Sequence, residues 1–221
     1  MYATNAKPVR EPEHGASSLP SLAPEPAQTP LEQQLRGRPT ASVGPLDAFH
    51  AARRHFLHGE RVDMGELATE LGVNRATLYR WVGSRDQLLG EIMWSMAERG
   101  IEQAREEASG TGVEWFMSAY RTFGALTSGS EPLRRFVERE PEAALRVMTS
   151  KRSRQQRRVI AAWRDILKEG EREHGLKLRL DPTTLAYVLV RIGESFLWTD
   201  LITGEEPDLS KADGVARVLL S

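Results

Sequence analysis

Cysteine is absent from the 221-residue chain, and so are a long apolar run and a strong excess of one charge. Without cysteine there is neither a disulfide framework nor a thiolate nucleophile, which favours a reducing cytoplasm. No stretch approaches the roughly 20 apolar residues that cross a bilayer, and we expect no secretory signal because the N-terminus lacks an apolar segment. The formal net charge is only −1. Any attraction to a polyanion is therefore expected to be local.

Motifs of catalysis are missing as well. The chain has neither a G-x-S-x-G nucleophile elbow nor a glycine-rich phosphate loop. His50, His55 and His58 fall close together, but no cysteine or further histidine cluster completes a set of metal ligands. We therefore expect no enzyme, no bound metal and no cofactor, and we interpret these histidines as exposed or capping side chains.

Branched apolar residues are scarce in residues 1–44, which hold seven of the twelve prolines. Such a composition does not repay the entropy of ordering, so it predicts a flexible tail. Within this tail, Arg36 and Arg38 flank a glycine and precede a proline. An extended arginine-glycine-arginine segment fits the narrow minor groove of A·T-rich DNA. The alternative is a plain solvated linker.

Residues 63–89 carry the most informative pattern. Asp63 and Asn74 are placed to cap two short helices, and Gly72 between them permits the left-handed backbone that ends a helix. Four apolar residues recur at helical spacing on one face of the first helix: Met64, Leu67, Ala68 and Leu71. Two helices joined so closely predict a helix-turn-helix.

The second helix of this motif, residues 75–82, presents a basic surface. Leu78 and Val82 are four residues apart and turn inward, which leaves the other side chains facing outward or sideways. Guanidinium groups bind guanine edges or phosphates, and hydroxyl groups suit phosphate oxygens. The candidate DNA contacts are Arg75, Ala76, Thr77, Tyr79, Arg80, Trp81 and Arg85. For the two aromatic residues among them, packing within the small domain is the alternative.

The run LGVNRATLYRWVGSRDQLL, residues 71–89, resembles the TetR family of bacterial transcriptional repressors, whose pattern here is approximately T-L-Y-x-H-F-x-S-K-x-x-L-L. The resemblance implies that three residues lie against bases, Arg75, Ala76 and Tyr79, and that three hold phosphates, Thr77, Trp81 and Arg85. The chain departs from the family at Trp81, where a histidine is usual, and at Gly65, where a polar residue often contacts the DNA backbone.

Apolar periodicity continues in helical form along the rest of the chain. Pro45 suits the first turn of a helix over residues 45–57, and Ser84 with Gln87 forms a capping box for a long helix to about residue 108. Further helices are predicted near residues 113–127, 131–139, 141–150, 152–174, 181–203 and 208–220. The long helix touches the helix over residues 75–82 at one end and the second domain at the other, so it could carry a displacement between them.

These elements predict an all-α fold of two domains. An N-terminal three-helix bundle with the helix-turn-helix is expected over residues 45–90, and a helical ligand-binding and dimerisation domain over residues 91–221. The basic residues 151–158 are interpreted as a solvated face rather than a second DNA contact.

Large apolar side chains of the second domain are expected mostly in its core. A sensor also needs a cavity with a few polar groups. Arg191 and Glu194 are three apart on an otherwise apolar helix, where an ion pair is costly unless it meets a ligand or a partner. The alternative is an internal or interfacial salt link. The ligand-binding candidates are Trp115, Tyr120, Phe123, Trp163, Arg191 and Glu194.

The helix over residues 181–203 has apolar positions for nearly five turns. Together with the final helix it could pair with its copy in a second chain. The candidate interface residues are Leu185, Val188, Leu189, Ile192, Phe196, Val215 and Leu219. The TetR resemblance implies the same arrangement, a homodimer that places two reading helices on a pseudo-palindromic operator.

The resemblance thus predicts a repressor that leaves double-stranded operator DNA when a small-molecule inducer fills the second domain. Residues 189–209 resemble a QsdR-like branch of the family, whose regulators control lactone degradation, including quorum-signal hydrolysis; this implies a lactone or acyl lactone as inducer. One alternative is a ligand-blind or activating DNA-binding dimer. Another, less favoured, is an enzyme that acts on a lactone.

Overall fold

The structure is a computed structural model that describes residues 29, 31–32, 43–149, 154–199 and 208–221. The regular elements of this described part are all α-helices, as the sequence predicts. None of these helices is both long and apolar enough to cross a membrane. Their bounds are α2 Pro45–Leu57, α3 Met64–Glu70, α4 Arg75–Val82, α5 Arg85–Glu106, α6 Val113–Ser128, α7 Glu131–Arg139, α8 Pro141–Thr149, α9 Gln155–Glu173, α10 Pro182–Leu197 and α12 Leu209–Leu220.

The helix-turn-helix forms through the local signals read from the sequence. The Asp63 carboxylate accepts hydrogen bonds from the backbone N–H groups of Gly65 and Glu66, at 2.7 and 3.0 Å, and so caps α3. Gly72 follows with φ +66°, the left-handed conformation that ends a helix. Asn74 then caps α4 by accepting from the backbone N–H of Thr77 at 2.7 Å. The turn therefore holds α3 and α4 at a fixed angle.

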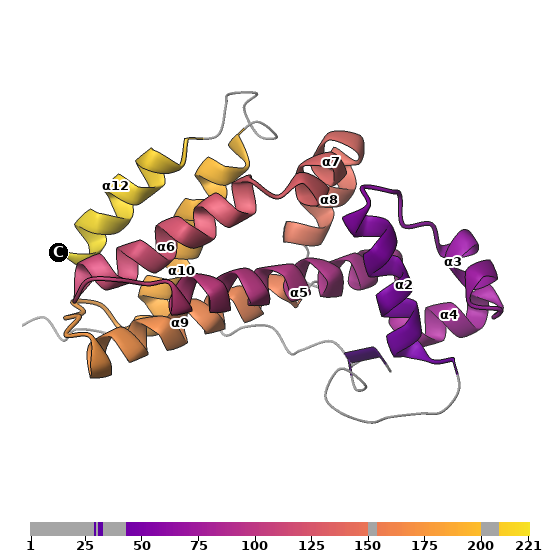
Figure 1. The fold of residues 1–221 in the computed structure, drawn as a ribbon, viewed down its shortest axis with the longest axis horizontal. Helices are drawn as coiled ribbons and strands as arrows, with labels where there is room; N and C mark the ends of the chain where they lie inside the picture. The colour runs from indigo at the N-terminus through magenta and orange to yellow at the C-terminus, as the bar shows by residue number, and fades with distance from the viewer. Residues whose placement is uncertain (1–28, 30, 33–42, 150–153, 200–207) are drawn as a thin grey trace, which may run out of the picture.

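The long helix α5 connects the two ends of the molecule (Figure 1). It starts with the expected capping box, in which the Gln87 N–H donates to the Ser84 hydroxyl at 3.1 Å and the Ser84 N–H donates to the Gln87 side chain at 2.8 Å. At 22 residues it is about 33 Å long. Its first turns pack beside α2 and α4, and its last turns pack beside α6 and α9.

Two clusters of buried side chains form the core. The first joins α2, α3, α4 and the start of α5 to α7 and α8; the ring centroids of Phe56 and Phe136 lie 5.4 Å apart within it. The second surrounds Trp163 and joins the end of α5 to α6, α9, α10 and α12. The helices α7 and α8, which follow residue 90 in the chain, thus pack onto the helix-turn-helix end.

A short piece of the N-terminal segment is buried, which corrects the expectation of a flexible tail at this point. The Leu31 side chain is 0% exposed within the first cluster. Thr29 and Glu32 cap one another, with N–H to side-chain oxygen distances of 2.7 and 3.2 Å. The Glu32 carboxylate lies 3.4 Å from the guanidinium of Arg154, and both side chains are less than 9% exposed.

A second ion pair lies beside the first. The Arg158 guanidinium donates to the Glu91 carboxylate at 2.6 Å and lies 5.6 Å from the ring centroid of Trp94. The interpretation of residues 151–158 as a solvated face is therefore wrong for Arg154, which is 8% exposed, and Arg158 is half-buried against Glu91. Residues 151–153 lie outside the described residues. These two pairs tie the start of α9 to α5 and to the N-terminal segment.

Candidate DNA-reading surface and ligand cavity

The outward face of α4 is open to solvent. Arg75, Ala76 and Arg80 are exposed, the Tyr79 side chain is 47% exposed, and Thr77 is half-buried. The opposite face is buried, with Leu78 at 0% and Val82 at 1% exposure. The structure thus brings five of the predicted DNA contacts to one surface. Arg36 and Arg38 lie outside the described residues.

Arg75 is oriented by a glycine on the neighbouring helix. Its guanidinium lies over Gly65 of α3, so close that a side-chain carbon at position 65 would overlap with it. The carboxylate of Asp63, whose pKa is held below its usual value chiefly by the N–H groups of Glu66 and then Gly65, also faces this guanidinium. The absence of a polar side chain at position 65 therefore makes room for Arg75 between the two helices.

Two predicted phosphate contacts are placed differently by the structure. Trp81 is half-buried and packs against the first cluster, which agrees with the alternative that it stabilises the small domain. Arg85 is engaged within the protein more extensively. Its guanidinium donates to the Val62 carbonyl at 2.6 Å and to the Glu140 carboxylate at 2.7 Å, with 18% of its side chain exposed. These bonds occupy Arg85 inside the protein.

A cavity of about 500 Å³ opens between α5, α6, α9, α10 and α12, and Leu133 of α7 and Met148 of α8 also belong to its wall. Most of its wall is apolar. Four of the predicted ligand-binding residues line it, namely Tyr120, Phe123, Trp163 and Glu194. Other apolar lining residues include Met93, Met96, Val159, Leu189, Leu197 and Trp198. The size and the apolar wall are typical of a small-molecule site.

One region of the cavity wall is polar. The Tyr120 hydroxyl donates to the Leu189 carbonyl at 2.9 Å, and it fits because position 193 is a glycine: a side-chain carbon there would come within 2.7 Å of the hydroxyl oxygen. Burial raises the pKa of Tyr120 to about 12, and the nearby carboxylates of Asp213 and Glu194 add to this shift. The phenol therefore remains protonated at neutral pH.

Glu194 is held in this region by two donors. Its carboxylate accepts from the Arg191 guanidinium at 2.6 Å and from the Gln156 side-chain amide at 3.1 Å. Burial raises the pKa of Glu194, and the charge of Arg191 and both hydrogen bonds oppose this change. The two residues that the sequence singled out thus form an ion pair, of which only the carboxylate side lines the cavity.

Two buried oxygen atoms in the cavity wall have no hydrogen-bond partner within the described part of the chain. They are Oδ1 of Asp213 and Oε1 of Gln155. The other carboxylate oxygen of Asp213 lies 3.5 Å from the Arg121 guanidinium. Sequence reasoning missed these residues because an isolated aspartate or glutamine on an amphipathic helix looks like a surface residue.

Two ligand-binding candidates do not line the cavity. Trp115 is 3% exposed and stacks on His174, with ring centroids 3.9 Å apart, so it belongs to the core around the end of α9. Arg191 is 44% exposed and points its charge at Glu194 rather than into the cavity. Helical periodicity does not reveal which face of a helix borders a cavity, so the sequence could not separate these two residues from the four candidates that line it.

The dimer candidates divide between the interior and the surface. Leu185 and Leu189 are 0% exposed in the second cluster, which corrects their assignment to an interface. Val188, Ile192, Phe196 and Leu219 are half-buried, and Val215 is exposed. Two further apolar side chains that the sequence analysis left out are at least half exposed, Tyr187 at 50% and Val218 at 76%. An apolar surface therefore remains on α10 and α12, one position away from the predicted stripe.

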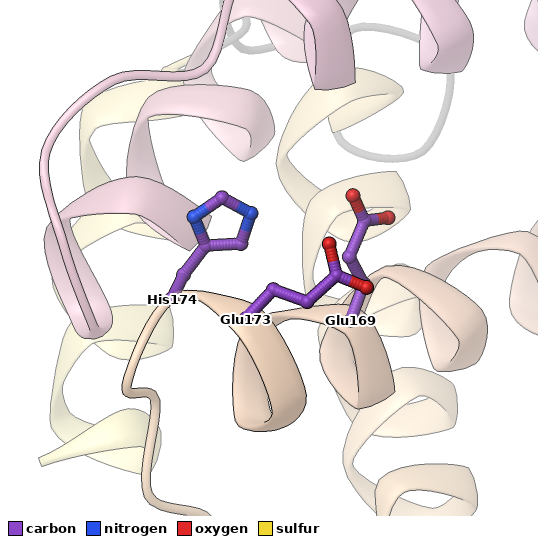
Figure 2. A group of neighbouring side chains, drawn as sticks. All are labelled: Glu169, Glu173 and His174. Carbon is purple, nitrogen blue, oxygen red and sulfur yellow. The ribbon is translucent and has the colours of Figure 1, made fainter.

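Glu169, Glu173 and His174 come together at the end of α9, and Figure 2 shows their side chains on the same side of the helix. Their potential ligand atoms all lie within 4.8 Å of one another. The Glu169 carboxylate, however, accepts from Arg105 at 2.6 Å, and the His174 ring stacks on a tryptophan. The group therefore closes the end of α9 against α5 and α6.

Comparisons with known proteins agree with this architecture. A family described as "Tetracyclin repressor-like, C-terminal domain" matches residues 111–221. The transcriptional repressor QsdR of R. erythropolis, from the TetR family, is 32% identical over 80% of this chain and 93% of its own, with a TM-score of 0.75. The TetR family repressor AlkX of Dietzia sp. strain DQ12-45-1b, implicated in biodegradation of n-alkanes, is 23% identical over 83% and 95%, with a TM-score of 0.56. No curated protein matches the chain.

Proposed function

Because the chain belongs to the TetR family of transcriptional repressors, we propose that its α4 surface reads an operator as half of a homodimer and that its cavity receives the inducer. Operator reading is supported by the arginines on α4, which are not paired with carboxylates in the described part of the protein. Arg75 and Arg80 form no ion pair within the described residues, whereas Arg85, at the start of α5, is paired with Glu140. Cations that remain available on a protruding helix suit phosphates and guanine edges.

Dimerisation through α10 and α12 is supported by the apolar side chains left on their surface. Tyr187, Val215 and Val218 are all more than 40% exposed there. Two reading helices related by a two-fold axis bind successive major grooves when they lie about 34 to 36 Å apart, one turn of DNA. The operator would then consist of two inverted half-sites.

The cavity supports control by a small molecule. Met93, Met96 and Gly100 of α5 belong to its wall, and the same helix begins beside α4. A ligand that favours one position of α5 weakens operator binding by the factor by which the operator weakens ligand binding. We keep a lactone or acyl lactone as the proposed class of inducer, on the resemblance of residues 189–209. A ligand-blind regulator gains no support from a cavity of about 500 Å³.

The DNA-reading role is tested by Arg75→Ala. Operator duplexes selected by this protein from random DNA, and duplexes changed at one base pair in each half-site, are titrated by fluorescence polarisation. The variant should lose roughly 1 to 3 kcal/mol on the selected operator and discriminate less at one base pair per half-site. Arg172→Ala is the matched control, since it removes an exposed arginine at the far end of α9. Equal effects of the two substitutions would contradict the assignment.

A further inference from the structure

The unpartnered oxygen of Asp213 restricts what the cavity will accept. Oδ1 of Asp213 is shielded from solvent, and no described group donates to it. An unpaired buried acceptor costs free energy, and a hydrogen-bond donor on a bound molecule would relieve that cost. Binding sites with buried polar groups that lack a partner discriminate strongly against molecules that leave those groups without a hydrogen bond.

Neighbouring groups in the wall do not supply the missing donor. The Tyr120 proton is given to the Leu189 carbonyl, and the Gln156 amide donates to Glu194. Arg121 approaches the other oxygen of Asp213 at 3.5 Å and is 48% exposed. Around the Tyr120 phenol, the cavity wall therefore presents several acceptors, namely the phenol oxygen, the carboxylates of Glu194 and Asp213, and Oε1 of Gln155.

Negative charge is disfavoured at the same place. An anionic head group near Tyr120 would face the carboxylates of Asp213 and Glu194, which lie close enough to raise the pKa of the phenol. Their counter-ions Arg121, which also lines the cavity, and Arg191 are already paired and are 48% and 44% exposed, so solvent screens their attraction for a third carboxylate.

We propose that the cavity selects a mainly apolar molecule whose head group carries no negative charge and donates a hydrogen bond, an amide N–H or a hydroxyl, to Asp213. This rests on the proposed function for its biological meaning, but binding alone tests it. A simple lactone ring offers only acceptors and leaves Oδ1 unpaired. An N-acyl amide or a hydroxylated lactone fills that position.

Three probes with the same eight-carbon acyl group test the rule: octanamide, methyl octanoate and octanoate. Their dissociation constants are measured by isothermal titration calorimetry with the full chain and without DNA. Octanamide should bind about tenfold more tightly than methyl octanoate, since it adds one hydrogen bond to a charged acceptor, and octanoate should bind most weakly. Equal or tighter binding of the ester or of octanoate would overturn the proposal, as would no binding by any of the three.

Asp213→Asn removes the charge with little change of shape and should reduce the preference for octanamide over the ester to about twofold or less. Asp165→Asn is the matched control, because Asp165 lies on α9 outside the cavity wall and its side chain is 63% exposed. It should keep the full preference. Thermal melts confirm that both variants are folded. An unchanged preference in Asp213→Asn would overturn the assignment of the donor to this residue.

Operator release separates this proposal from the proposed function. If octanamide binds with the expected preference but leaves operator affinity unchanged, the proposed function fails and the selectivity stands. If methyl octanoate binds and releases the operator as well as octanamide does, the proposed function stands and the selectivity is refuted.

Discussion

Replacing Arg85 by alanine separates a structural arginine from a DNA-binding one. Its guanidinium joins the carbonyl of Val62, which precedes α3, to Glu140, which lies between α7 and α8. The substitution removes both hydrogen bonds and leaves Glu140 with Arg61 as its remaining cation among the described residues, at 3.7 Å. The side chains of Arg85 and Glu140 are 18% and 19% exposed, so water replaces the missing guanidinium only in part.

The expected cost follows from these hydrogen bonds. Those that involve a charged group contribute about 1.5 to 3 kcal/mol each when buried, and partial exposure reduces this. We expect Arg85→Ala to lower the free energy of unfolding by about 2 kcal/mol, which for a chain of this length lowers Tm by about 4 to 8 °C. The number of phosphates that the protein binds should not change.

The matched variant is Arg80→Ala, which removes an exposed arginine from the same motif. Thermal melts of the two variants and of the wild-type protein measure stability, and operator titrations at several salt concentrations measure the slope of log K against log salt. Arg80→Ala should leave Tm within about 2 °C and reduce the magnitude of the slope by about 0.9 for each phosphate that Arg80 neutralises in the wild-type complex. Arg85→Ala should show the opposite pattern.

The reasoning would be refuted if Arg85→Ala kept the wild-type Tm and reduced the salt slope. That result would mean that Arg85 leaves Glu140 and holds a phosphate, as the family resemblance implied. A decrease in both Tm and salt slope for Arg85→Ala would instead assign the residue to both surfaces.

Two other substitutions test the charges and the close packing. Hydrogen bonds to Glu70 and then Glu60 raise the pKa of His55 above 6.5, so the stabilisation by the charged imidazole is present at low pH and disappears as pH rises through the raised pKa. In thermal melts from roughly pH 6 to 8, the difference in Tm between the wild-type protein and His55→Gln should therefore shrink. A constant difference would count against this ion pair. Gly193→Ala places a carbon 2.7 Å from the Tyr120 hydroxyl. We expect it to lower the free energy of unfolding in urea by about 1 to 3 kcal/mol and to weaken octanamide binding. If stability and octanamide affinity both stayed at the wild-type values, the phenol would move freely.

Local signals made the helix-turn-helix predictable. The caps at Asp63, Asn74 and Ser84 and the stop at Gly72 depend on residues within four positions of one another, and each appears in the structure as the sequence predicts. The side-chain direction of α4 followed from the same short range, since Leu78 and Val82 need a core and their neighbours do not. The all-α architecture is a sum of such local preferences.

Contacts between distant parts of the chain were not predictable in this way. Glu140 stands 55 positions from Arg85, so nothing near the arginine marks it as paired. The helix α10 is apolar on more than one face, and periodicity alone could not show that Leu185 and Leu189 turn inward while Tyr187 stays exposed. The polar end of the cavity depends on side chains from four helices, which no single motif records.

The burial of Leu31 makes the described residues 29 and 31–32 part of the folded unit. Its side chain fills a place among the packed helices, and the methyl group of Thr29 lies next to Gly83, the residue that ends α4. Trimming the protein to begin at α2 would vacate that place, at roughly 2 to 5 kcal/mol by analogy with deleting a buried leucine, and would take away the carboxylate that faces Arg154. Shortened versions, and fusions that pull on this segment, are consequently expected to melt earlier than the intact chain.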